Sequence, residues 1–308
     1  MTGYEALHNS AAWLDVSSRG RIKMLGEDRA RLLHAMTTNH IQQLTPGTGC
    51  YAFFLTAQGR LLSDANILCR PDQLLLDLEP ETREKIYQHL DHFIIADDVT
   101  LEDVTDQTAA IAIEGPKAAE ILRAAGAPLP DTEYGNIEWG TRLVVRLPLG
   151  FFIFTPAEEK QELIAQIEAA GAVAADAEAF RVVRIEHGKP RYGEDLSERF
   201  LAQEANQPHA LHFSKGCYLG QEIVERVRSR GQVHRVLMPL VLETKEPPRP
   251  GAKLQIGEAS AAEITSAAYS PALDKVVALA YVRTEHARPH THMMLGETQA
   301  EVATPAKL

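Results

Sequence analysis

The pattern of apolar and polar residues follows the same order twice in the first half of this chain. Residues 21–25 (RIKML) alternate polar and apolar side chains, as a half-buried strand does, and residues 27–36 then place apolar side chains at helical spacing. Residues 109–113 (AAIAI) and 116–126 (PKAAEILRAAG) repeat this order, and Gly126 is typical of a helix end. The pattern predicts a strand followed by a helix in each stretch.

Each stretch continues with two more strands and a second helix. Residues 61–80 and 141–156 each have the pattern of a hairpin, and helices are predicted over 81–94 and 157–171, both of which begin with acidic residues. No G-x-G-x-x-G loop follows a strand, which argues against a doubly wound dinucleotide-binding sheet. We therefore predict an α+β fold in which two related α+β units have antiparallel sheets.

The last part of the chain has a different pattern. From residue 236 onward, short apolar runs are separated by Gly and Pro turns, which predicts a small β-barrel or sandwich without a helix. We place the C-terminal β-barrel at 236–308. The region 1–235 then holds two interleaved α+β subdomains, the second at approximately 106–175. The segment 246–251 (EPPRPG) is the best signal for a domain boundary.

Composition narrows the class of protein. The 308 residues carry a formal net charge of −11, which argues against a general binder of nucleic acid or of anionic membranes. No stretch approaches the roughly 20 apolar residues that a membrane span needs. Only three cysteines are present, which indicates a reducing compartment rather than a disulfide framework. Since the first residues lack a targeting pattern, we expect a cytoplasmic protein.

One of the three cysteines stands in a distinctive setting. Cys50 and Cys69 lie in strand patterns and are expected in the core, whereas Cys217 lies between glycines in FSKGCYLGQEIVERV (213–227). Leu219, Ile223 and Val227 recur every four residues, which predicts a helix from about Gln221 with this stripe buried. A helix N-terminus and the nearby Lys215 would both favour the thiolate of Cys217. The alternative is a small buried apolar residue that happens to contain sulfur.

Basic and acidic residues close to this motif are further candidates. Residues 215–235 carry a local charge of +3, which suits either a solvated helix face or a site for a carboxylate or phosphate. Glu186 follows an alternating stretch that predicts a strand ending in a loop, where a carboxylate could pair with the amidine edge of a heterocycle. Asp64 has apolar neighbours, which makes partial burial plausible. Either carboxylate could instead be solvated or ion-paired.

Two other kinds of chemistry have weaker support. His209, His212 and Cys217 form one group in the sequence, and His286, His290 and His292 form another, but neither has the tight spacing of a zinc site. We predict no metal site. A Cys–His hydrolase is possible in principle, although no nucleophile elbow supports one.

The motif KGCYLGQE (215–222), followed by Arg226, Gly231 and Arg235, resembles the K-G-C-Y-x-G-Q-E signature of the YgfZ family of folate-binding proteins. These are relatives of the glycine-cleavage T protein, an aminomethyltransferase. The resemblance extends over most of the chain, including GRLLSDANIL (59–68) and RIEHGKPRYGEDL (184–196). It implies two α+β units that hold tetrahydrofolate, a C-terminal β-barrel, and a role in iron–sulfur cluster assembly or repair.

The resemblance also implies roles for individual residues. Cys217 matches the cysteine on which the family's activity is expected to depend, and Glu186 matches the T-protein glutamate that pairs with the pterin. Asp64 matches the second of two adjacent T-protein aspartates, whereas Ser63 replaces the first, which argues against aminomethyl transfer. The positions that match the flanks of the signature cysteine are Lys215, Tyr218, Gln221, Glu222 and Arg226, and together with Asp64 and Glu186 they are the residues expected to bind the cofactor. His290 and His292 depart from the family pattern and receive no role.

Three functions follow as hypotheses. The first is a tetrahydrofolate-binding accessory protein for iron–sulfur clusters that uses Cys217, with iron–sulfur enzymes as clients. The second is a folate-dependent aminomethyl- or methyltransferase of the T-protein type. The third is a scaffold whose basic helix docks a protein or RNA. Enzymatic activity is therefore left open by the sequence.

Overall fold

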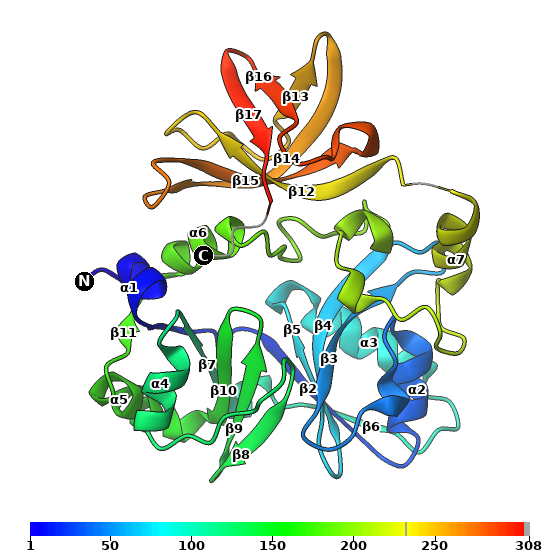
Figure 1. Cartoon of the computed structure of the whole chain (residues 1–308). Helices are drawn as coiled ribbons and strands as arrows, with labels where there is room; N and C mark the ends of the chain where they lie inside the picture. Colours follow the sequence, from blue (N-terminus) through cyan, green and yellow to red (C-terminus); the bar gives the residue numbers. More distant parts are fainter. Residues whose placement is uncertain (232, 305–308) are drawn as a thin grey trace. The chain divides into compact units, whose positions relative to one another are not determined.

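The computed structural model describes residues 1–231 and 233–304, with the side chain of Arg230 outside the description (Figure 1). The chain forms two compact units. Unit 1 consists of Met1–Leu55, Leu62–Ala177 and His209–Leu219, and unit 2 consists of Thr56–Leu61, Glu178–Pro208 and Gly220–Leu308. In the described residues we find no helix with the length and apolarity that a transmembrane span requires.

The first sheet of unit 1 comes from the first copy of the repeated pattern. Its strand order is β3-β4-β5-β2-β6, with β2 (Gly20–Leu25), β3 (Gly49–Leu55), β4 (Leu61–Cys69), β5 (Leu74–Leu78) and β6 (Thr100–Asp103). Helices α2 (Arg29–Met36) and α3 (Arg83–Phe93) cover one face, because alternate strand residues and the apolar stripes of both helices form one buried cluster. Cys50 and Cys69 pack at the edge of this cluster and are half-buried.

The second sheet of unit 1 comes from the second copy. Its order is β11-β1-β7-β10-β9-β8, with β1 (Ala12–Asp15), β7 (Thr108–Glu114), β8 (Asn136–Trp139), β9 (Arg142–Leu147), β10 (Gly150–Pro156) and β11 (Val173–Ala174). Helices α4 (Ala118–Ala124) and α5 (Lys160–Ala169) pack on one face around a second apolar cluster. The predicted strands and helices of both copies are thus confirmed, and a short helix α1 (Gly3–Asn9) precedes them.

The two sheets share one strand order, with a single exchange. Strand β6 pairs antiparallel with β2 in the first sheet, and the equivalent place beside β7 is taken by the N-terminal strand β1. Strand β11, which follows α5 as β6 follows α3, pairs parallel with the outer edge of β1. The N-terminus of the chain therefore completes the sheet of the second copy.

Arg21 connects the two sheets of unit 1 from a fully buried position. It lies on β2, and its guanidinium donates to the carbonyls of Arg19, Ser17, Thr105 and Thr108 and to the hydroxyl of Thr108, at 2.6 to 3.0 Å. Thr108 begins β7 of the second sheet. Residues 22–25 alternate between buried and half-buried positions, as the pattern predicts. Arg21 alone departs from it, because these five bonds satisfy a polar side chain away from water.

Unit 2 contains the predicted β-barrel. The closed order is β12-β15-β14-β13-β16-β17, with β12 (Arg235–Leu242), β13 (Lys253–Ile256), β14 (Ala259–Ser270), β15 (Lys275–Arg283), β16 (His292–Leu295) and β17 (Thr298–Val302). Small and β-branched side chains fill its interior. The segment 246–251 connects β12 to β13 inside the barrel, so the expectation of a domain boundary there is wrong. Helices α6 (Ala177–Glu186) and α7 (Gln221–Arg230) precede the barrel.

Candidate functional site

A buried carboxyl group lies on the sheet face of unit 1 that α2 and α3 leave uncovered. Ala65 and Ile67 of β4 point into the helix-covered cluster, so strand alternation turns Asp64 to the opposite face. Asp64 is 8% exposed, and its Oδ2 accepts a 2.7 Å hydrogen bond from the hydroxyl of Tyr51 on β3. Its Oδ1 is buried without a hydrogen-bond partner among the described residues. This oxygen could accept a proton or an N–H donor from a ligand.

An ion-pair group lies on the same face. Arg19 donates from Nε and Nη2 to the two oxygens of Asp77, at 2.8 and 2.9 Å, and also pairs with Glu79. Asn66, two residues beyond Asp64 on β4, donates to Asp77 at 2.8 Å. The Arg19 guanidinium also lies 5.6 Å from the ring centre of Phe152 on the second sheet. The uncovered face of the first sheet is therefore polar, and ion pairs and hydrogen bonds hold its side chains in place.

The environment of Asp64 changes its acidity. Burial raises the pKa of Asp64 to about 6, and the nearby Glu79 adds to this effect, although the Tyr51 hydroxyl and Arg19 act against it. Burial and the proximity of Asp64 also raise the pKa of Tyr51 well above its usual value. A carboxyl group with a pKa near neutrality can take up and release a proton under physiological conditions, as a general acid or base must.

Aromatic rings extend this site in a direction that the sequence analysis missed. The His209 ring lies 5.4 Å from that of Tyr51 and is stacked with that of Tyr134 at 6.5 Å. Tyr51 stands on the strand that neighbours Asp64, so hairpin alternation in residues 49–69 could have identified it. No sequence signal connects His209 or Tyr134 with Asp64, because their contacts depend on distant parts of the chain.

Ser63 faces the other way. It is fully buried, and its hydroxyl donates to Thr82 at 2.8 Å, near the start of α3. Adjacent strand residues point to opposite faces, so a carboxylate at position 63 would not lie beside Asp64. The argument against aminomethyl transfer that rests on Ser63 therefore loses its structural basis.

Lys215 fastens the first part of the KGCYLGQE motif to the C-terminal end of α2. Its Nζ donates to the carbonyls of His34, Thr37 and Asn39, at 2.5 Å from His34 and 2.8 Å from Asn39. Burial lowers the pKa of Lys215 to about 7, and the nearby Cys50 acts against this effect. All three donors are used by the backbone, which makes Lys215 an anchor of the loop.

The anchored loop exposes the thiol. Cys217 is exposed, while Tyr218 is half-buried with its ring centre 4.7 Å from the Lys215 ammonium. Leu219 donates its backbone N–H to the carbonyl of Ala35 at 2.9 Å. Backbone and side-chain contacts with α2 therefore hold both sides of Cys217, and the alternative of a buried, core-filling cysteine is wrong.

Three histidines pack under this loop. The rings of His34 and His40 contact edge to face at 4.6 Å, and those of His40 and His212 at 5.1 Å. Each has a buried Nδ1 without a hydrogen-bond partner in the described residues. Burial, followed by Lys215 and the two other rings, lowers the pKa of His34 to about 4. Across residues 1–231 and 233–304, no group of three His, Cys, Asp or Glu side chains can hold a metal ion.

Glu186 lies in unit 2, at the C-terminal end of α6, and is 5% exposed. The predicted strand over residues 182–186 is wrong, because the segment is helical. Phe180, Val183 and Glu186 are buried at spacings of three, which follows one helix face, and burial of Val182 and Ile185 removes the apparent alternation.

The second part of the motif begins α7 of unit 2. Gly220 precedes this helix with φ +83°, a value that favours glycine. Gln221 is half-buried, whereas Glu222 and Arg226 are exposed. The helix is confirmed, but its fully buried residue is Val224, with Ile223 and Val227 half-buried. The basic stretch is partly neutralised, since Arg228 pairs with Glu225 at 3.5 Å; the side chain of Arg230 lies outside the described residues.

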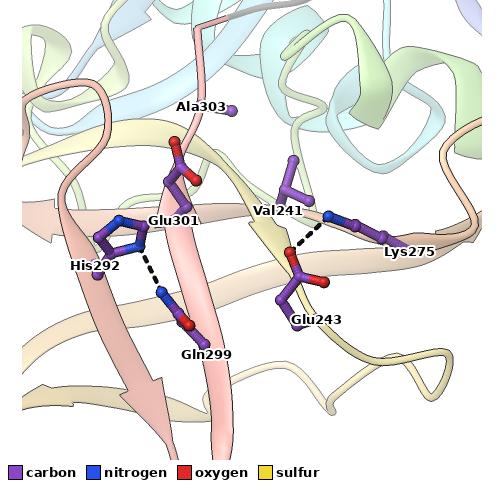
Figure 2. Close-up of a pocket in the computed structure, with 7 residues that line it drawn as sticks. All are labelled: Val241, Glu243, Lys275, His292, Gln299, Glu301 and Ala303. Carbon is purple, nitrogen blue, oxygen red and sulfur yellow. Dashed lines mark hydrogen bonds and ion pairs between the residues drawn. The ribbon is translucent and has the colours of Figure 1, made fainter.

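The barrel carries a small hollow of about 370 Å³ near the two histidines that depart from the family pattern (Figure 2). The amide Nε2 of Gln299 donates to Nδ1 of His292 at 2.8 Å, and Lys275 pairs with Glu243 at 2.6 Å. His290 contacts Glu301 at 2.6 Å. These polar side chains are paired with one another, so their contacts stabilise the surface of the barrel.

Comparisons with known proteins find relatives that are named transferases or aminomethyltransferases. A putative chloroplastic transferase from Arabidopsis thaliana is 28% identical over 274 residues, which cover 85% of this chain but only 63% of that protein. An aminomethyltransferase from Rubrobacter xylanophilus is 29% identical over 293 residues, covering 92% and 78%. The crystal structure of glycine cleavage system aminomethyltransferase T from Bartonella henselae superposes with a TM-score of 0.88 at 19% identity, covering 98% and 87%, which establishes the fold.

Two family models match successive parts of the chain, one before the barrel and one over the barrel. Residues 2–215 match the GCVT N-terminal domain, and residues 235–306 match the glycine cleavage T-protein C-terminal barrel domain. The chain therefore belongs to the glycine-cleavage T-protein family, within the aminomethyltransferase-like superfamily.

Proposed function

We propose that this chain is a tetrahydrofolate-binding accessory protein that supports iron–sulfur cluster assembly or repair in the cytoplasm through the thiol of Cys217. The observation that carries the proposal is the exposed Cys217 in a loop that Lys215 fastens to the end of α2. A fixed and accessible thiol suits sulfur, redox or cluster chemistry on client enzymes better than a packing role. The likeness of KGCYLGQE to the YgfZ signature supports the same reading.

Two carboxyl groups fit the folate in this proposal. The unpartnered, buried Oδ1 of Asp64 would accept an N–H donor of the ligand, and Glu186 would accept from the amidine edge of the pterin. Bound tetrahydrofolate would supply a reduced pterin and a one-carbon carrier. Tyr218, Gln221, Glu222 and Arg226 would contribute further contacts to the cofactor, with Lys215 as a positioning residue.

Two measurements test the parts separately. Calorimetric titration with tetrahydrofolate should show saturable binding that Asp64→Asn and Glu186→Gln weaken at least about tenfold, which is 1.4 kcal/mol. Glu178→Gln, on the exposed side of the same helix α6, should bind as the parent does. Absence of binding at high micromolar tetrahydrofolate would exclude the folate site.

The thiol is tested in a strain that lacks the gene. Cys217→Ala should fold normally but fail to restore the activity of iron–sulfur enzymes, whereas Cys69→Ala should restore it. Full rescue by Cys217→Ala would exclude a role for the thiol while leaving the folate result intact.

A second candidate is folate-dependent aminomethyl transfer. The raised pKa of Asp64 favours it, since a carboxyl group that titrates near pH 6 can exchange a proton with a folate amine. This function requires turnover of a methylamine donor in vitro that is lost in Asp64→Asn and retained in Cys217→Ala. The accessory function predicts the opposite dependence on these two residues.

A further inference from the structure

Unit 2 contains a second, larger hollow that neither the folate site nor the thiol uses. Its volume is about 1,020 Å³, within the range of sites for small organic ligands. Three arginines from separate elements line it: Arg60, Arg235 and Arg283. The rest of the lining consists of two carboxylates, two apolar residues and two other polar residues: Glu204, Glu285, Leu201, Val233, His234 and Thr284.

Two of these arginines are cross-strand neighbours on adjacent strands of the barrel. Arg235 begins β12 and Arg283 ends β15, and the two are directly opposed in the antiparallel register. Like charges in such a pair repel each other and destabilise the sheet unless something neutralises them. The position of Arg60, in the turn that precedes β4, adds a third guanidinium to the same hollow.

Arg235 is neutralised and held in place. Its Nε donates to Glu204 at 3.1 Å, and the other oxygen of Glu204 accepts from the backbone N–H of Leu201 at 2.9 Å. The guanidinium lies 4.8 Å from the ring centre of Phe200 and 5.4 Å from that of Tyr281. Both carboxylate oxygens of Glu204 therefore accept hydrogen bonds within the protein.

Among the described contacts, no carboxylate neutralises Arg60 or Arg283 as Glu204 neutralises Arg235. Arg60 donates Nη1 to the backbone carbonyl of Arg199 at 2.6 Å, which leaves its charge in place. The carboxylate that approaches Arg283 is that of Glu285, at 3.9 Å, and both side chains are more than half exposed. Exposed pairs at such distances contribute little. The lining therefore carries three arginines against the carboxylates of Glu204 and Glu285, and its net charge is positive.

We propose that this hollow binds a small organic anion whose phosphate or carboxylate group is held by Arg60 and Arg283. The planar guanidinium offers paired donors to either oxyanion. Leu201 and Val233 supply apolar surface for the rest of the ligand, and Arg235, held by Glu204, also lines the site. The proposal goes beyond folate binding at Asp64 and does not depend on it.

Calorimetric titrations with inorganic phosphate, citrate and phenyl phosphate test the site in the full chain. We expect saturable binding of at least one probe, with phenyl phosphate tighter than inorganic phosphate because of the apolar wall. The double variant Arg60→Gln/Arg283→Gln should weaken binding at least about tenfold, or 1.4 kcal/mol. Preference for citrate over the phosphates would identify carboxylates as the ligand group.

The matched control is Arg249→Gln, an exposed arginine between β12 and β13 that does not line the hollow. It should bind as the parent does, and so should Asp64→Asn. If the double variant shows an altered circular dichroism spectrum, Arg283→Gln alone replaces it. No saturable binding, or equal losses in the Arg249 variant, would overturn the proposal.

Discussion

The hydroxyl of Tyr51 donates a 2.7 Å hydrogen bond to Oδ2 of Asp64 and leaves Oδ1 buried without a partner in the described residues. One half of the carboxyl group is thus fixed by the protein, and the other half is held ready for a ligand or a proton. Such a half-satisfied buried group costs stability, and its retention is typical of functional sites.

Asp64→Asn should make the stability of the protein less dependent on pH. The pKa of Asp64 is about 6 in the folded protein and near 3.8 when unfolded, so the folded state binds the proton more tightly between these values. The contribution of this group to the free energy of unfolding is therefore present at low pH and lost as pH rises from about 4 through 6. As the pH rises from 4 to 7.5, the free energy of unfolding of the variant, measured with urea, should increase relative to that of the parent by up to about 3 kcal/mol.

The control for this measurement is Asp72→Asn, at an exposed turn. It should change the free energy of unfolding by less than about 0.5 kcal/mol at any pH. A difference between Asp64→Asn and the parent that stays constant from pH 4 to 7.5 would show that Asp64 does not titrate in this range.

The fold could be predicted because its signals are local. Strands over residues 109–113 and 151–154 and helices over 81–94 and 157–171 have apolar spacings that tertiary contacts reinforce. The exchange of β1 into the second sheet could not be predicted, because a four-residue strand carries too little pattern to specify its partner. The burial of Arg21 could not be predicted for a related reason, since its five acceptors lie in turns and strands that come together only in the folded chain.

Cys217 should be the thiol that reacts first with Ellman's reagent in the native protein. It is exposed, whereas Cys50 and Cys69 are half-buried, and burial raises the pKa of Cys50 to about 12. We expect one rapid equivalent that disappears in Cys217→Ala and persists in Cys69→Ala. Three equivalents should react together only after denaturation, and a rapid phase that survives in Cys217→Ala would contradict the assignment.

Gly59→Ala should destabilise unit 2 by more than its backbone conformation alone explains. Gly59 has φ +71°, and a Cβ there would lie 2.8 Å from Cβ of Ile223 on α7. Gly257→Ala is the matched control, because Gly257 has φ +61° but open space around it. We expect losses of about 1 kcal/mol for Gly257→Ala and 2–4 kcal/mol for Gly59→Ala in thermal unfolding. Equal losses would show that Ile223 moves aside.

The site was harder to predict than the fold. The sequence neighbours of Asp64, Glu186 and Cys217 indicated these three residues as candidates. In the structure the two carboxylates are buried and the thiol is exposed. The sequence does not indicate the anchoring role of Lys215, because proximity to Cys217 suggests only an electrostatic effect on the thiol. Its actual acceptors are carbonyls about 180 residues earlier in the chain, at the end of α2.

Lys215→Met should release the Cys217 loop while leaving most of unit 1 folded. The substitution keeps the apolar stem but removes a charged donor that serves three carbonyls, so we expect a loss of about 2–3 kcal/mol in the free energy of unfolding. Hydrogen exchange should accelerate at Leu219, whose backbone N–H donates to Ala35, before it accelerates in the strands. Lys253→Met, at an exposed position on β13, should change neither quantity. Unchanged exchange at Leu219 in the Lys215 variant would mean that the backbone contact with Ala35 holds the loop unaided, and Lys215 would then lose its role as the anchor.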